Sequence, residues 1–209
     1  MSGIKTYKFG RNKIFIILNN IPGYENDTNN FIKTLYNPLN KNSYFYYFSN
    51  LNDIKLLEYY IWCIYQKFPA SDIIMFISVY GSELNKEVFY LGEYLFPFSA
   101  LTNAFAKSRP KSQNKVLIFA AVVELNPRMG GTKIDKTLIN LYKVPLNVNT
   151  SENILLTTIM KNKIFSQDVL YDDMTIDLSL ALTEIDQSYA PTKIDFGADG
   201  MILIPKLTQ

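Results

Sequence analysis

The longest uninterrupted apolar run in the chain covers residues 115–123 and reads Lys-Val-Leu-Ile-Phe-Ala-Ala-Val-Val. Turn-forming segments flank it at residues 113–114 and 124–127. A strand that is apolar along its whole length is buried on both faces, which is typical of the centre of a parallel α/β sheet. In such sheets, ligands and catalytic groups gather beyond the carboxyl ends of the strands. We therefore expect a functional site near residues 120–123, although none of these side chains is reactive.

Shorter apolar runs with turn residues at their ends predict the other strands of the sheet. Two runs on either side of Gly92-Glu93 predict a hairpin, because a glycine favours the tight turn that joins two antiparallel strands. We expect strands at residues 13–18, 44–48, 72–79, 87–91, 94–96, 153–159 and 200–204.

Apolar residues at helical spacing predict helices between these strands. One begins after Asn52, the expected N-cap, and another begins near Ser99. A third covers residues 174–189, with three residues expected to face inward, namely Ile176, Leu180 and Ile185. Alternating strands and helices predict an α/β fold with three layers, a mostly parallel central sheet and helices on both faces.

The connection after the central strand is different in character. Residues 124–150 contain two prolines and two adjacent glycines, at positions 127, 145, 130 and 131, and the pattern predicts no regular element there. A long irregular connection inside a compact domain is usually functional or disordered. We expect residues 127–150 to act as a linker within a single domain of 209 residues.

Charge and cysteine content narrow the range of functions. The net charge of +2 gives no basis for expecting nucleic acid or a membrane as a partner. The N-terminus has no apolar signal segment, and the single cysteine, Cys63, fits a reducing compartment. We expect a cytoplasmic protein with Cys63 as a structural thiol. We expect no cofactor and no metal, since the acidic residues near positions 172–199 lack the spacing of a cation-binding loop.

The chain contains no histidine. This excludes Ser-His and Cys-His nucleophile pairs, catalysis by imidazole as acid or base, and most zinc sites. Any enzyme with this sequence would need a different reactive group.

The order of the motifs nevertheless resembles the caspase family. Strand 72–79 leads into Tyr80-Gly81-Ser82-Glu83, and the hairpin follows. Next come a helix through residues 101–105 and a strand ending in Ala-Ala-Val-Val-Glu-Leu at residues 120–125. The resemblance also includes the first strand and residues 153–168, which are similar to the opening of the caspase small subunit. It implies that residues 1–126 are similar to the large subunit and residues 151–209 to the small subunit.

The resemblance places substitutions at both catalytic positions and at two positions of the substrate pocket. The position of the catalytic histidine corresponds to Tyr80, and that of the nucleophilic cysteine to Val122. Ala120 and Asp168 occupy two positions that in caspases help to bind the substrate aspartate, and Asp168 replaces an arginine. Valine offers no nucleophile, and a phenol is a poor general base at neutral pH. A negative charge at Asp168 would repel a substrate carboxylate.

The resemblance also implies how the chain associates with a partner. Caspases pair through a strand near the end of the chain, and the apolar residues after Gly200 resemble that strand. We expect an edge strand here that forms a homodimer or joins a caspase, because an exposed edge can template another strand. The expected contact residues are Ile202, Leu203, Ile204, Pro205 and Leu207.

From the sequence we expect a pseudocaspase, which is a catalytically inactive homologue and not an enzyme. It would bind a caspase or a caspase adaptor and regulate apoptosis. One alternative is a viral or structural protein that uses the caspase fold without a caspase partner. Another is an unrelated α/β enzyme, which would need a polar constellation at the strand ends beyond Ser78, Tyr80, Glu83 and Glu124.

Overall fold

The structure is a computed structural model of residues 1–209. It describes residues 13–21, 29, 43–49, 51–107, 115–128, 137–144, 158, 169–196 and 203–204.

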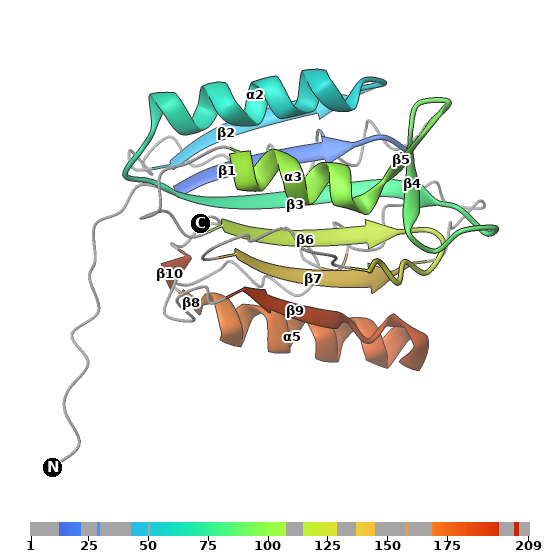
Figure 1. The fold of residues 1–209 in the computed structure, drawn as a ribbon. Helices are drawn as coiled ribbons and strands as arrows, with labels where there is room; N and C mark the ends of the chain where they lie inside the picture. The colour runs from blue at the N-terminus through green and yellow to red at the C-terminus, as the bar shows by residue number, and fades with distance from the viewer. Residues whose placement is uncertain are drawn as a thin grey trace, which may run out of the picture.

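A mostly parallel sheet forms the centre of the molecule (Figure 1). Its strands run in the order β2-β1-β3-β6-β7-β9, and all neighbours are parallel except β7 and β9. Strands β3 and β6 are central, and they are buried because both of their faces carry apolar side chains. The bounds are β1 (Lys13–Asn19), β2 (Ser43–Ser49), β3 (Asp72–Gly81), β6 (Lys115–Ala121), β7 (Thr137–Lys143) and β9 (Thr192–Phe196).

Helices cover both faces of this sheet. Helices α2 (Ile54–Lys67) and α3 (Phe98–Lys107) share one apolar core with alternate residues of the strands, including Leu141 of β7. The next residue, Tyr142, hydrogen-bonds to Ser179 of helix α5 (Tyr171–Ile185) at 3.2 Å. Successive side chains of a strand point to opposite faces, so α5 lies on the other side of the sheet from α2 and α3. The predicted α/β class, with a mostly parallel central sheet between helices, is confirmed.

Helix α2 has the predicted buried stripe, but its N-cap differs from the predicted one. Its stripe of Leu57, Ile61 and Ile64 is buried against the core, as expected. The N-cap, however, is Asp53 rather than Asn52, and its Oδ1 accepts a hydrogen bond from the N–H of Lys55 at 2.8 Å. A carboxylate oxygen at this position satisfies one of the free N–H groups of the first turn.

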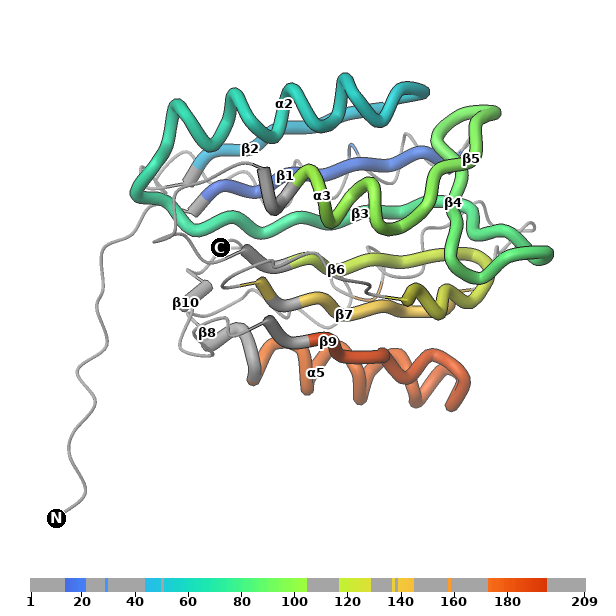
Figure 2. The backbone as a smooth tube through the Cα atoms, in the orientation of Figure 1, coloured from blue at the N-terminus to red at the C-terminus, as the bar shows by residue number. Residues whose placement is uncertain are grey.

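The predicted hairpin is present at the carboxyl end of the parallel strands (Figures 1 and 2). It consists of β4 (Val88–Leu91) and β5 (Tyr94–Pro97), and β4 also pairs with the end of β3. Gly92 has a φ of +61°, in the left-handed region that glycine adopts without strain. The turn at Gly92-Glu93 therefore forms as its sequence predicts.

The prediction of an irregular connection over residues 124–150 is wrong, because it includes β7. This strand pairs with β6 over its whole length, from Lys115 opposite Thr137 to Ala121 opposite Lys143. The predicted strand at residues 153–159 is also wrong at Thr158, the one residue of it that the structure describes, which is helical and buried.

The terminal strand has a different partner from the one expected. Strand β10 (Leu203–Ile204) pairs antiparallel with β8 (Val169–Leu170) in a separate two-stranded sheet. Leu203 and Ile204, the described residues of the predicted strand 200–204, are thus not in the central sheet. In the part of the chain that the structure describes, β9 is the last strand of that sheet next to β7.

Helix α5 presents the opposite face from the one predicted. Ile176, Leu180 and Ile185 were expected to point inward, but they are 56%, 59% and 57% exposed. The buried residues are Met174, Leu178 and Leu182. The predicted helix also ends four residues early, at Ile185, and the 3₁₀ helix η1 (Gln187–Tyr189) follows it.

Among the described residues, no helix has the length and apolar character needed to cross a membrane.

Candidate functional site

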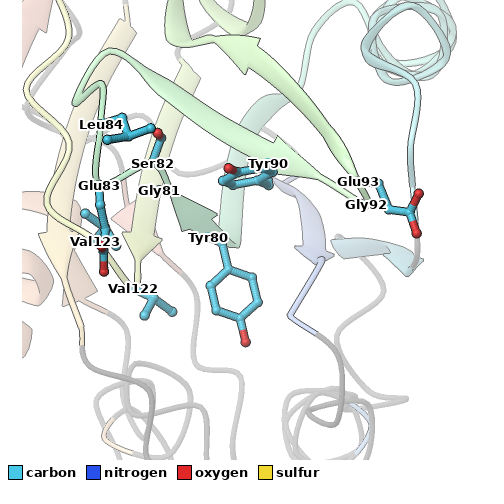
Figure 3. A pocket seen from close by; sticks show the side chains of 10 residues that line it. All are labelled: Tyr80, Gly81, Ser82, Glu83, Leu84, Tyr90, Gly92, Glu93, Val122 and Val123. Atoms are coloured by element: carbon cyan, nitrogen blue, oxygen red, sulfur yellow. The ribbon is translucent and has the colours of Figure 1, made fainter.

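A pocket of about 610 Å³ lies where strands β3 and β6 end, next to the hairpin (Figure 3). This is the edge of a parallel sheet at which ligands usually bind. Its lining comes from three segments, namely the end of β3 with the turn after it, the hairpin, and the two residues after β6. The described lining residues are Tyr80, Gly81, Ser82, Glu83, Leu84, Tyr90, Gly92, Glu93, Val122 and Val123.

Tyr80 and Val122, the two residues at the predicted catalytic positions, lie in this one pocket. They come together because β3 and β6 are parallel neighbours, with Val79 opposite Ala121. The N–H of Val122 then donates a hydrogen bond to the carbonyl oxygen of Val79 at 3.2 Å, which continues the ladder beyond the end of β6. The pairing of the two strands thus places Tyr80 and Val122 next to each other in the lining of the pocket.

The close approach of the two strand ends depends on Gly81. A Cβ atom there would meet Val123 and Leu125, the residues that continue the chain after β6. Glycine is therefore needed for the backbone after β6 to pass against the end of β3.

Two ion pairs hold the segment after β6 against the turn after β3. Lys86 Nζ and Glu124 Oε2 are 2.5 Å apart, and Arg128 Nε and Glu87 Oε1 are 3.0 Å apart. The backbone N–H of Asn126 also donates to the carbonyl oxygen of Lys86 at 2.8 Å. The hydrogen bond from Lys86 and its positive charge lower the pKa of the Glu124 carboxyl.

The pocket offers oxygen atoms and no thiol or imidazole among its described residues. Ser82 is buried, and its Oγ accepts a hydrogen bond from the N–H of Asn85 at 3.3 Å, so this hydroxyl stabilises the turn. Cys63 lies half-buried on α2 and does not line the pocket. The residues that line the space include two tyrosines, two glutamates and aliphatic residues, a set suited to binding a polar or cationic group.

The other predicted site residues are not brought into this pocket. Ala120 is completely buried within β6, opposite Ser78 of β3, and is not a lining residue. Asp168 lies outside the described residues. Of the expected contact residues near the end of the chain, Leu203 and Ile204 have a described backbone, which pairs with β8. Ile202, Pro205 and Leu207 lie outside the described part.

Sequence reasoning missed Tyr90 and Glu93 as site residues. Both belong to the hairpin, whose position against β3 depends on pairing between Tyr80 and Tyr90. The sequence does contain an indication of their position. The connection between β3 and β4 is short, so β4 must fold back beside the end of β3.

In the described residues no group of three or more His, Cys, Asp or Glu side chains could hold a metal ion.

Comparison with solved structures shows the same fold in a caspase. The structure titled "Crystal Structure of drICE" superposes with a TM-score of 0.52, over 91% of this chain and 90% of that chain, at 13% sequence identity. No protein-family model matches this sequence, and no curated protein is similar to it. The chain therefore has a caspase-like fold over nearly its whole length.

This likeness corrects one expectation drawn from the sequence. We expected a protein that is not an enzyme, but drICE is a caspase, and a caspase is a protease. The fold found here is thus that of an enzyme, and the residues at positions 80 and 122 do not show that the chain lacks catalysis. They show that a thiol and an imidazole are not the groups at those two positions.

Proposed function

We propose that this chain regulates caspases, and through them apoptosis, by associating with a caspase or with a caspase adaptor. The observation that carries the proposal is a caspase-like fold over 91% of the chain with Tyr80 and Val122 at the mouth of its site. A shared fold places strand edges in similar positions, through which a homologue can take the place of a partner subunit.

The pocket supports a binding role. It keeps the position at the strand ends and the close approach of Gly81 to the chain after β6, but it presents phenols and carboxylates to a ligand. Binding energy at such a site can hold a peptide segment of a partner without a covalent step. We propose that this association takes place in the cytoplasm, where a chain with a single cysteine stays reduced.

The proposed association can take two forms, a homodimer of this chain or a complex of this chain with a caspase. Residues 202–205 and Leu207 remain the predicted contact residues on grounds of resemblance. Among the described strands, β9 is at one edge of the central sheet and offers a second strand edge for such pairing.

The test is co-purification of the tagged chain from cells in which caspases are active, followed by identification of the bound proteins. We expect a caspase or an adaptor to be retained in near-equal amount, and the rate of caspase substrate cleavage to change when purified chain is added. Leu180→Asp, at an exposed position of α5 remote from the pocket lining, serves as a control for nonspecific effects of a surface change.

The chain is also assayed alone on peptide substrates, so that a peptidase activity of its own is measured separately. Absence of any caspase or adaptor from the purified material, together with unchanged caspase rates at saturating concentrations of the chain, would contradict the proposal. That outcome would favour a structural role without a caspase partner.

A further inference from the structure

The pocket at the strand ends has acidic and no basic residues in its described lining. Two of its ten described lining residues are acidic, Glu83 and Glu93, and none of the ten is basic. Both carboxylates belong to exposed residues, so neither carries a cost of burial. The described part of the lining therefore carries two negative charges.

Two cations of the segments that follow β3 and β6 are engaged with other carboxylates. Lys86 binds Glu124, and Arg128 binds Glu87. None of these four residues lines the pocket. These two cations therefore do not neutralise Glu83 or Glu93.

Two aromatic rings lie between the acidic residues. Tyr80 and Tyr90 are directly opposite each other in the antiparallel pairing of β3 with β4, and opposite residues project from the same face of such a pair. Figure 3 shows their rings in the middle of the site, with Glu83 on one side and Glu93 on the other. A guanidinium group stacks on tyrosine faces and is attracted by their π electrons.

The turn of the hairpin contributes one of the acidic residues to the lining. Gly92 has a φ of +61°, and a Cβ atom there would lie 3.1 Å from the Cβ of Asn52. The tight turn therefore packs against Asn52, and both of its residues, Gly92 and Glu93, line the pocket. At about 610 Å³, the pocket has room for one long side chain together with its flanking residues.

We infer that this pocket binds an arginine side chain, or second best a lysine side chain, within an extended segment of a protein partner. The inference rests on the proposed function, because it names the part of the partner that enters the site. Tyr80 and Tyr90 would stack on the guanidinium plane, and Glu83 and Glu93 would face its charge from two sides. An aspartate side chain, which the caspase resemblance implies as the ligand, is repelled by the same two carboxylates.

The test uses four synthetic peptides, acetyl-Ala-Ala-Xaa-Ala-Ala-amide, in which Xaa is arginine, lysine, citrulline or aspartate. Citrulline has the shape of arginine without its charge. Dissociation constants are measured by NMR titration of the full chain at low and high salt. We expect the arginine peptide to bind about tenfold more tightly than the citrulline peptide, given two exposed carboxylates and a cation–π contact. Salt is expected to reduce this ratio, because it screens exposed charges.

Matched variants assign the preference to this pocket. Glu83→Gln and Glu93→Gln each remove a charge and keep the size of the side chain, and each is expected to lower the ratio of arginine to citrulline affinity by about threefold. Glu184→Gln, at an exposed residue of α5 that does not line the pocket, is expected to leave the ratio unchanged. Tyr90→Leu is expected to weaken arginine binding, whereas Tyr90→Phe keeps the aromatic face and most of the affinity.

Several results would overturn the inference. These are equal affinities for arginine and citrulline peptides, tighter binding of the aspartate peptide, no measurable binding of any peptide, or a ratio that neither Glu83→Gln nor Glu93→Gln alters. The comparison of peptides on the wild-type chain does not depend on the folding of any variant. The two failures can be told apart. If the wild-type chain shows no preference for arginine over citrulline, but the double variant Glu83→Gln/Glu93→Gln still captures a caspase, the proposed function stands and this inference fails.

Discussion

A Cβ atom on Gly81 would lie 2.6 Å from the backbone carbonyl oxygen of Val123. This distance is shorter than carbon and oxygen atoms can approach without bonding, and the obstacle is backbone rather than a movable side chain. The end of β3 and the segment after β6 can therefore hold their positions in the site only if residue 81 has no side chain.

We expect Gly81→Ala to lower the free energy of unfolding by about 1–3 kcal/mol, as is typical when a packed site receives an extra methyl group. The measurement is urea denaturation of both proteins. Leu125→Ala is the informative partner variant, because Leu125 Cδ2 would also lie only 3.2 Å from the new atom. If the carbonyl of Val123 is the obstacle, Leu125→Ala will not restore the stability of Gly81→Ala, and full restoration would show that the side chain was responsible.

The orientation of α5 gives a second prediction. Leu178 is completely buried, whereas Leu180, two positions along, is 59% exposed. Replacing Leu178 with alanine removes buried methyl groups and is expected to cost about 2–5 kcal/mol. Replacing Leu180 with alanine is expected to change stability by less than about 0.5 kcal/mol. Equal losses for the two variants, measured by thermal or urea unfolding, would mean that the helix is rotated from the orientation described here.

The ion pair between Lys86 and Glu124 predicts a pH effect with a definite sign. Lys86 lowers the pKa of the Glu124 carboxyl in the folded chain, so the pair stabilises the fold above the pKa of a free glutamate, about 4.3. The stabilisation is lost as the pH falls through the lowered pKa. Both side chains are 55% exposed, so we expect it to be small, within the range of about 0–1 kcal/mol for surface pairs.

Lys86→Met tests this directly. Carboxyl NMR titration should show the Glu124 pKa rising toward its ordinary value in the variant, while that of Asp186 stays low, because a hydrogen bond from Ser188 holds it there. An unchanged Glu124 titration would mean that Lys86 does not bind this carboxylate in solution.

The position of Cys63 predicts that any hydrolysis by this chain does not use its only thiol. The residue lies on α2 and is not part of the pocket lining, and no histidine exists to activate it. Cys63→Ser is therefore expected to leave peptide cleavage and peptide binding unchanged. The measurement compares rates for the wild type, the variant and alkylated protein, and a loss of rate in both altered proteins would assign a catalytic role to Cys63.

Local patterns predicted most of the sheet, because its central strands are apolar on both faces and end in recognisable turns. Helix α2 was also placed correctly on its core stripe of Leu57, Ile61 and Ile64. Its exposed face also carries large apolar side chains, Tyr59 and Trp62, but these are aromatic and do not form a regular aliphatic stripe. Where one face is clearly more apolar, periodicity identifies the buried side.

Helix α5 lacked that contrast. Apolar residues occur at every second position from Met174 to Leu182, so two stripes at helical spacing are equally apolar. Sequence periodicity cannot choose between them, and packing against the sheet decides. Strand β7 was missed for a different reason, because the buried polar residue Asn140 interrupts its apolar pattern between segments rich in glycine and proline.

The site could be located from the sequence, but its composition could only be predicted in part. Tyr80 and Val122 follow strands whose parallel pairing brings their ends together. Tyr90 and Glu93 enter the pocket through pairing of the hairpin with β3. That contact depends on how the hairpin packs against the sheet, and the residues of the hairpin do not determine it alone.

The pairing of β6 with β7 has a consequence for how the polypeptide can be divided. Residues 115–121 and 137–143 form one parallel ladder, and β9 pairs with β7 on its other side. Two separate polypeptides, one ending at residue 128 and one beginning at residue 137, would still contain every strand of that ladder. The molecule is thereby suited to fragment complementation, in which two co-expressed pieces reassemble through backbone hydrogen bonds into one noncovalent unit.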